Sequence, residues 1–213
     1  MAARHNQRAA RRRLLRPLVL RGRLRYHGRV VEPAVSWATS FLSLRQFVDE
    51  TYGAGSFRRL REVLKQQHDI ELPQPIVLGT WLPTVQLVTA QATARELFGP
   101  PDFHARLGWA AAAYELTWLQ RLAMRFTSPQ FFLERGAQHW RGRHSSGTWT
   151  YDSRPHWIRG TLRDFAVVDA GFCDMMRAWL THACVMTGAG KAYVVERECR
   201  AKGAAACIFE GSW

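Results

Sequence analysis

The sequence predicts an α+β fold in which a helical hairpin and further helices pack on a small antiparallel sheet with a C-terminal β-hairpin. Apolar residues recur at helical spacing from residue 36 to about residue 141, and short runs separated by turns replace them after residue 147. Hydrophobic residues make up 47% of the 213 residues, with nine Trp and eleven Phe, so the chain can build one sizeable core.

The helical hairpin is expected to begin after Ser36. The buried face of its first helix is predicted to hold Trp37, Phe41, Leu44, Phe47 and Val48. The glycines of "TYGAG" end this helix, and a second helix is expected to follow Ser56. Its buried face is predicted to hold Phe57, Leu60, Val63 and Leu64.

Three further helices are expected after a proline-interrupted connection, "IELPQPIVLGTWLP". Pro83 suits the first turn of a helix that runs to Phe98. A long helix is predicted over residues 103–125, where the alanines at 110–113 permit close packing. In "TSPQFFLERGAQHW", Thr127 or Ser128 can cap the next helix ahead of a proline.

The sheet is expected from the runs "TWTYDS" and "HWIRGTLRDF", which are typical of two strands joined by a turn. A last helix is predicted from Asp169 to Thr187, where "GAG" stops it. Two strands, "KAYVVEREC" and "ACIFEGSW", then form a hairpin around a turn that contains Gly203.

The net charge of +13 is concentrated at one end of the chain. Residues 1–29 hold ten Arg and no acid, whereas the other 184 residues hold twenty Lys and Arg against seventeen acids. We therefore predict a basic, disordered arm over residues 1–29 and a single domain over residues 30–213. The alternative is that the arm binds an anionic surface, either lipid or nucleic acid.

The sequence argues against several classes of protein. It contains no apolar run long enough to span a membrane, and its basic start lacks the continuous apolar segment of a secretory signal, so we expect a cytoplasmic protein. Neither a G-x-S-x-G elbow nor a phosphate-binding loop nor an H-E-x-x-H helix is present. We therefore expect that the protein is not an enzyme.

The four cysteines all follow residue 172, and Cys199 and Cys207 are separated by a glycine-containing turn. They are too few and too clustered for a disulfide scaffold. A metal site, buried reduced thiols and an oxidisable Cys199–Cys207 pair remain open interpretations. Cys184 is expected to be a packing residue, because free cysteine is among the most buried side chains.

The order of a helix with Cys173, a strand with the E-x-x-C pair Glu196 and Cys199, and Cys207 across a hairpin resembles the V4R family of ligand-binding domains. This family shares its fold with Bet3-like proteins and, more distantly, with haem-NO-binding domains; small myxobacterial paralogous proteins are similar. The resemblance covers about the last 45 residues. It implies a structural zinc site formed by Cys173, Glu196, Cys199 and Cys207.

Three thiolates and a carboxylate would form a closed tetrahedral shell, which suits a structural zinc. On a regular strand, however, residues three apart point to opposite faces. Glu196 and Cys199 therefore need a twist or bulge to converge.

The stretch "FTSPQFFLERGAQHW" resembles the S-P helix start common in the wider superfamily, and "FLSLRQFVDETYG" resembles the opening helix of haem-NO-binding domains. Those domains hold haem with a helical histidine and a Y-x-S-x-R motif. This chain has "YDSR" at Tyr151 to Arg154, which is one residue too short, and His104 near a helix start. Haem is therefore the less favoured cofactor, and the histidines of "HWRGRH" form no recognisable cage.

The resulting hypothesis is a non-enzymatic regulatory domain that binds a small apolar molecule or an acyl chain, with structural zinc. The alternatives are a haem-based gas sensor and a ligand-free protein-interaction scaffold. Its partners would be the ligand, a protein that receives the signal, or a second copy in a homodimer. A helix that exposes Trp37 or Trp118 would support the homodimer.

Overall fold

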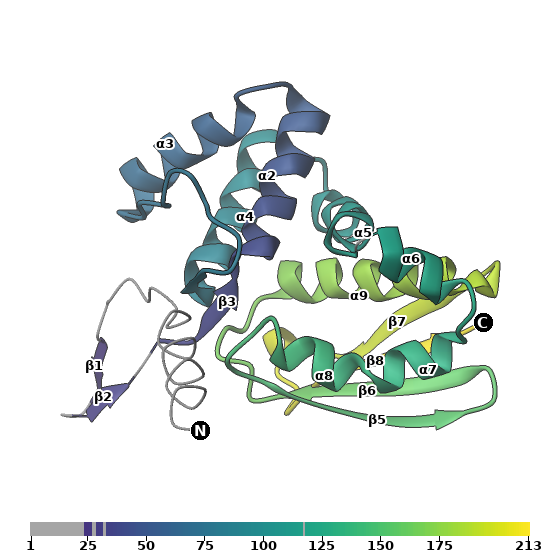
Figure 1. The fold of residues 1–213 in the computed structure, drawn as a ribbon. Coiled ribbons are helices and arrows are strands. Elements are labelled where there is room, and N and C mark those ends of the chain that lie inside the picture. Colours follow the sequence, from purple (N-terminus) through teal and green to yellow (C-terminus); the bar gives the residue numbers. More distant parts are fainter. Residues whose placement is uncertain (1–23, 27–28, 32, 117) are drawn as a thin grey trace, which may run out of the picture.

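The computed structural model describes residues 24–26, 29–31, 33–116 and 118–213. These residues form an α+β fold, as the sequence predicts, with helices packed on one face of an antiparallel sheet (Figure 1). The α-helices are α2 (Ala38–Tyr52), α3 (Ser56–His68), α4 (Thr84–Phe98), α5 (Phe103–Glu115), α6 (Trp118–Met124), α7 (Pro129–Glu134), α8 (Gly136–Arg141) and α9 (Ala170–Cys184). In this described part of the chain, every helix is too short or too polar to span a bilayer.

The main sheet has four antiparallel strands in the order β5-β6-β8-β7. Its strands are β5 (Thr148–Arg154), β6 (Trp157–Arg163), β7 (Tyr193–Glu198) and β8 (Cys207–Ser212). Two short pairs lie outside it, β1 (Leu24–Tyr26) with β2 (Arg29–Val31) and β3 (Val35–Trp37) with β4 (Trp81–Pro83). The first pair spans the expected end of the basic arm, and residues 1–23 of that arm lie outside the described residues.

The two faces of the main sheet differ. On the inner face, Ile158, Val194 and Phe209 are buried against apolar residues of α7 and α9. On the outer face, Arg159 and Arg197 both form ion pairs with Glu210. This alternation along each strand is the pattern of a sheet with one covered and one solvated face.

Helix α5 crosses α9 at close range because small residues lie at the contact. A β-carbon on Gly108 would lie 2.0 Å from the main-chain oxygen of Met175, so only glycine fits there. Ala111 and Ala112 are also buried on α5. The prediction that small residues allow close helix packing in this segment is therefore confirmed.

Several boundaries differ from the predictions, and one of them is the end of the last helix, which is predicted at Thr187 and lies at Cys184. Helix α2 begins at Ala38, because residues 35–37 form β3 with β4 as partner. The helix predicted over residues 103–125 is broken at Leu116, whose backbone is extended. The helix capped by Ser128 ends at Glu134, and a separate helix follows. Strands of three residues are too short to show alternation, so the sequence could not reveal β3 or β4.

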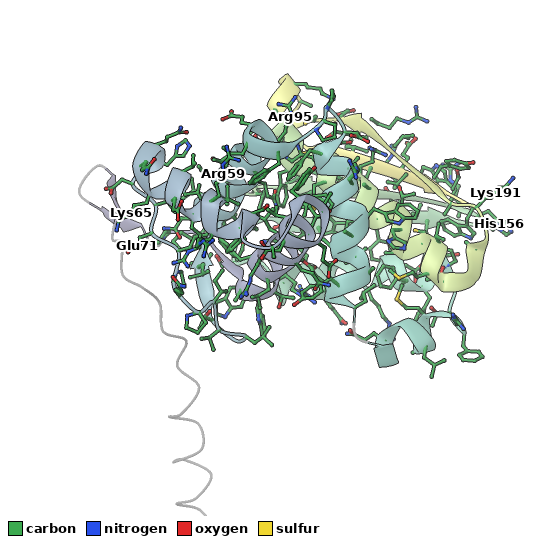
Figure 2. All side chains as sticks on the ribbon, turned by 90° about the horizontal axis from the view of Figure 1, so that it is seen from above. Arg59, Lys65, Glu71, Arg95, His156 and Lys191 are labelled. Carbon is green, nitrogen blue, oxygen red and sulfur yellow. The ribbon has the colours of Figure 1, made fainter. Side chains whose placement is uncertain are left out.

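Charged side chains lie around the outside of the fold. Figure 2 shows Lys65 and Glu71 at the α3 end of the molecule, where their side chains lie 3.3 Å apart, and His156 and Lys191 at the opposite end. Such exposed pairs contribute about 1 kcal/mol or less to stability. The stability of the fold therefore depends mainly on its buried contacts.

Candidate functional site

Four side chains predicted as metal ligands come together where α9 meets the β7–β8 hairpin. Cys173 lies in the first turn of α9, which Asp169 caps by accepting a hydrogen bond from the Phe172 N–H at 2.7 Å. Cys207 opens β8, and Glu196 and Cys199 come from β7 and the residue that follows it. One ligand atom from each of the four residues lies within 4.8 Å of the others.

A β-bulge permits this convergence. The pairing of β7 with β8 shifts register between Glu196 and Glu198, so one residue of β7 has no partner. A bulge bends its strand and redirects the side chains that follow. Glu196 and Cys199 consequently reach the same point, which residues three apart on a regular strand do not do.

The thiols of the cluster interact directly. The sulfurs of Cys173 and Cys207 are 3.4 Å apart, and the main-chain N–H of Arg200 donates to Cys207 Sγ at 3.5 Å. The hydrogen bond from the Cys173 thiol lowers the pKa of Cys207 to about 6, and the same bond raises the pKa of Cys173. Burial raises the pKa of Cys199.

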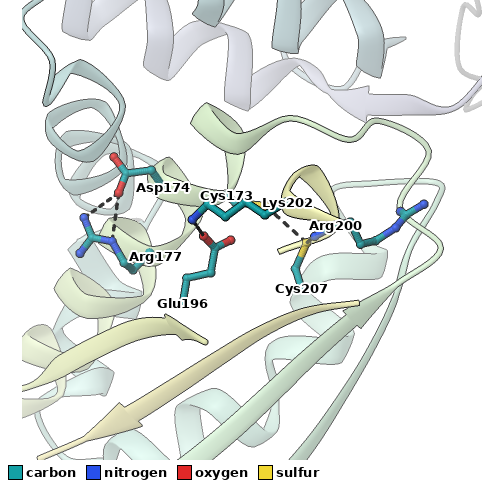
Figure 3. Close-up of polar contacts among 7 residues, drawn as sticks. All are labelled: Cys173, Asp174, Arg177, Glu196, Arg200, Lys202 and Cys207. Atoms are coloured by element: carbon teal, nitrogen blue, oxygen red, sulfur yellow. Dashed lines mark hydrogen bonds and ion pairs between the residues drawn. The ribbon is translucent and has the colours of Figure 1, made fainter. Parts of the chain in front are cut away.

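Glu196 completes the donor set. Its Oε2 accepts a hydrogen bond from the Lys202 ammonium at 3.1 Å, whereas its buried Oε1 has no partner among the described residues (Figure 3). A buried carboxylate oxygen without a donor is costly unless a cation or proton satisfies it. Together with three buried sulfurs, this oxygen fits a tetrahedral zinc. The residues present therefore suit the metal that the resemblance implies.

Cys184 provides an internal comparison on the same helix. It is 1% exposed and lies outside the cluster, and burial raises its pKa to about 12. A thiol in that state is neutral and packs as a small apolar group. The prediction of a packing role for Cys184 agrees with this burial.

A second candidate site is a cavity between α2, α5, α9 and the α7–α8 segment. Its volume is about 70 Å³, counted as the space open to the centres of water molecules. Its walls are mostly aromatic and aliphatic, and include Phe132, Trp140, Trp149, Phe172, Met175, Met176, Trp179 and Leu180. A mostly apolar cavity with a few polar groups is the usual form of a small-molecule site.

An ion pair lines one part of this cavity. Arg143 Nη1 donates to Glu115 Oε2 at 3.2 Å, and Arg143 Nη2 donates to the Glu115 main-chain oxygen at 3.3 Å. Ser43 donates to the other carboxylate oxygen at 3.2 Å. Burial raises the pKa of Glu115, and the Arg143 guanidinium opposes that rise. The Glu115 carboxylate and the Arg143 guanidinium therefore neutralise each other within the protein.

Two histidines of the cavity wall come from the "HWRGRH" stretch. Burial lowers the pKa of His139 to about 4 and that of His144 to about 3, so both are neutral at pH 7. His144 Nδ1 lies 2.8 Å from the Ser36 hydroxyl, which lies 2.9 Å from the Thr84 hydroxyl. This network joins the segments that carry Ser36, Thr84 and His144. Because Ser36 is fully buried, its hydroxyl is not accessible to a substrate as a nucleophile.

The cavity residues were missed by the sequence analysis, and a weak signal was available. The stretch "HWRGRH" places His139, Trp140, Arg143 and His144 close together in sequence, and we interpreted it only as a failed metal cage. Glu115 gave no signal, because its partner Arg143 is 28 residues away along the chain.

The residues that the sequence analysis weighed against a haem site lie away from the cavity. His104 is buried beside Gly171 and does not line the cavity, and its Nε2 has no partner among the described residues. Tyr151 is 43% exposed, and the Arg154 guanidinium lies 5.0 Å from the centre of the Trp157 ring. Neither belongs to the cavity wall, and the arginine that does, Arg143, is paired with Glu115.

The fold and these two sites define an α+β domain with a small, mostly apolar cavity and a cysteine-rich cluster. No protein-family model matches the sequence, and no curated protein matches it. Solved structures of H-NOX proteins, which are haem-NO-binding domains, do share the fold. One from Shewanella oneidensis in the Fe(II) state has a TM-score of 0.63 at 13% identity and covers 83% of this chain and 95% of its own.

Two other H-NOX structures agree with this match. A Shewanella oneidensis domain with a histidine-to-glycine substitution, in the Fe(II)CO state, has a TM-score of 0.58 at 15% identity and covers 83% of this chain and 97% of its own. An unliganded Fe(II) mutant from K. algicida has a TM-score of 0.56 at 12% identity and covers 83% and 95%. At such identities the likeness is one of fold. The V4R and Bet3-like resemblance stays a prediction.

Proposed function

We propose that this chain is a non-enzymatic regulatory domain that binds a small molecule in the cavity between α2, α5, α9 and the α7–α8 segment. The observation that supports this most directly is the cavity itself, whose wall contains Trp140, Trp149 and Trp179. The H-NOX structures with the same fold carry CO or NO ligation states, so the fold is one that accommodates small ligands.

Filling the cavity tests this proposal. Toluene binding to the full chain is expected to change the tryptophan fluorescence, and Ala111→Leu, which adds three carbons to the cavity wall, is expected to abolish the change. Ala113→Leu on the same helix is the matched control, because Ala113 does not line the cavity. Toluene that leaves the wild-type fluorescence unchanged, with no heat of binding by calorimetry, contradicts the proposal.

The cluster of Cys173, Glu196, Cys199 and Cys207 has a separate role in this proposal, as a structural zinc site. Zinc there would join the start of α9 to the β7–β8 hairpin and supply folding energy. All four side chains would be used as ligands, so the metal would have no open position for a substrate. Regulation would then depend on the cavity and stability on the cluster.

A haem-based gas sensor is the second candidate, and the H-NOX neighbours favour it. His139 is the relevant residue, because it lines the cavity and burial lowers its pKa to about 4, which keeps its ring neutral at pH 7. Protein purified from haem-replete cells tests it. A Soret band in the wild type that disappears in His139→Ala supports the haem sensor. If the wild type shows no Soret band, the haem sensor is rejected and the small-molecule-binding domain remains.

The signal from such a domain would pass to a partner protein or a second copy of the chain. Trp37, which we expected to be exposed if a homodimer forms, is half-buried with its ring 5.4 Å from that of Trp81. The Trp118 side chain lies outside the described residues. The homodimer and the binding of an anionic lipid or nucleic acid by residues 1–29 stay predictions.

A further inference from the structure

The turn that joins α6 to α7 presents apolar side chains to solvent. Phe126 is 85% exposed there, and Leu122 on α6 and Phe131 on α7 are each 44% exposed. Helix α6 contacts the segment Val185–Ala189 that follows α9, and it lies on the outside of the fold (Figure 1). Exposed apolar side chains gathered on one segment mark a surface that binds a protein or a membrane.

The main chain of this turn is held by its own hydrogen bonds. The N–H groups of Phe126 and Thr127 donate to the carbonyls of Ala123 and Met124 at 3.1 and 3.0 Å. The Thr127 hydroxyl also donates to the Met124 carbonyl, at 2.9 Å, and Ser128 caps α7. A segment whose backbone polar groups are already bonded can enter a lipid headgroup layer without leaving them unsatisfied.

The charged side chains of the turn are positive. Residues 116–133 contain two Arg and no Asp or Glu. Arg125 directly precedes Phe126, and the Arg135 guanidinium lies 4.3 Å from the centre of the Phe131 ring. Within the described part of the chain, neither arginine pairs with a carboxylate. Both are therefore available to an anionic partner.

The acids on either side of this segment do not offset its positive charge. Glu115 pairs with Arg143 at 3.2 Å. Glu134 accepts hydrogen bonds from Gln130 and Ser153, each at 3.0 Å. Both carboxylates are therefore engaged within the protein.

A second exposed apolar side chain lies in a different charge environment. Leu78 is 68% exposed in the connection from α3 to β4, which lies away from α6 in Figure 1. That connection contains Asp69 and Glu71, which an anionic surface would repel. The combination of apolar exposure with unpaired positive charge therefore favours the α6–α7 turn.

We propose that the α6–α7 turn docks on an anionic lipid bilayer, with Phe126 entering the headgroup region and Arg125 and Arg135 binding lipid phosphates. Interfacial segments combine inserted apolar side chains with Arg contacts to anionic lipids in this way. The inference goes beyond the proposed function and does not depend on a ligand in the cavity. It also differs from membrane binding by residues 1–29, because it requires side chains of the folded domain.

Sedimentation of the full chain with lipid vesicles tests the proposal. We expect the protein to bind vesicles of equimolar phosphatidylcholine and phosphatidylglycerol and to stay in solution with phosphatidylcholine alone. Binding should weaken as the salt concentration is raised, because salt screens the attraction of arginine to anionic lipids. Failure to bind the mixed vesicles would overturn the proposal.

Substitutions in the turn separate it from the basic residues at the start of the chain. Phe126→Ser should weaken binding to the mixed vesicles about tenfold, because one large apolar side chain no longer inserts. Arg125→Gln should weaken it about fivefold. Phe126→Trp should retain binding, since tryptophan favours the membrane interface. Leu78→Ser is the matched control and should bind as the wild type does.

The exposure of Phe126 makes this test independent of folding. Phe126→Ser should keep the melting temperature of the wild type, so that a loss of binding reflects the lost side chain. Equal binding by the wild type and Phe126→Ser would assign the binding to residues 1–29 and overturn the proposal. A wild type that is dimeric by size-exclusion chromatography, with a monomeric Phe126→Ser, would make the turn an interface between two copies and would also overturn it.

Discussion

The cysteine cluster and the cavity lie along the same helix, α9, and use buried polar groups in opposite ways. In the cluster, Cys173 and its three neighbours direct their donor atoms at one point, and Glu196 Oε1 has no partner within the described part of the chain. In the cavity, Glu115 and Arg143 neutralise each other and leave apolar space beside them. The comparison shows how one helix can contribute to a candidate metal site at one end and to a candidate ligand site along its length.

The largest expected effect is on the cluster. Cys199→Ser should lower the free energy of unfolding of the zinc-loaded protein by on the order of 4 kcal/mol, because a lost metal ligand uncouples metal binding from folding. A chelator should lower the melting temperature of the wild type and have little effect on the variant. Cys184→Ala is the control, because its cost should not depend on chelation. If neither Cys199→Ser nor the chelator alters the melting temperature, the cysteines are buried reduced thiols and do not bind zinc.

The next effect concerns the ion pair of the cavity. Glu115→Gln leaves the largely buried Arg143 guanidinium without its counter-charge and should cost about 3 kcal/mol in urea denaturation. The exposed pair of Lys65 and Glu71 provides the control, since Glu71→Gln should change stability by less than about 1 kcal/mol. If both changes cost the same, the Glu115–Arg143 pair would be no more dependent on its counter-charge than an exposed pair. The contrast drawn above between the cavity and the cluster would then fail.

The next effect is at the crossing of α5 with α9, the helix that carries residues of both sites. Gly108→Ala places a methyl group against the Met175 main-chain oxygen and should destabilise the fold by about 2 kcal/mol. It should also weaken toluene binding, since Met175 lines the cavity. Gly142→Ala has an ordinary φ and no close contact, so it should be neutral or slightly stabilising. A neutral Gly108→Ala would show that the helices can move apart freely.

The smallest effect is on the pH dependence of stability. The pKa of His139 is lowered to about 4 from its ordinary 6.5, so the unfolded state binds more protons between these values. Its contribution is therefore complete above pH 6.5 and is lost as the pH falls toward 4. His139→Gln should flatten the stability profile in this window, and His156→Asn, at an exposed turn, should not. Parallel profiles for wild type and His139→Gln would contradict the burial of this ring.

The sequence could predict the parts of the fold that depend on local pattern. Ser128 caps its helix by accepting from the Phe131 N–H, and β5 to β8 lie in the runs expected to form strands. Convergence of Cys173, Glu196, Cys199 and Cys207 followed from the family resemblance, and the bulge supplies the geometry that local rules lacked. The cavity is lined by residues such as Glu115 and Arg143, which are 28 residues apart and are brought together by tertiary packing that leaves no periodic signal in the sequence.

The buried hydrogen bonds around β3 bear on how the chain folds during synthesis. Ser36 contacts His144, 108 residues later, and the Val35 N–H donates to the Ser145 hydroxyl, 110 residues later. Contacts between such distant residues form slowly, because a long loop must close first. The hydrogen bonds of β3 therefore form only after about residue 145 has left the ribosome. The helices on which α2 packs, α3, α4 and α5, precede that residue, so most of the packing of α2 can form earlier.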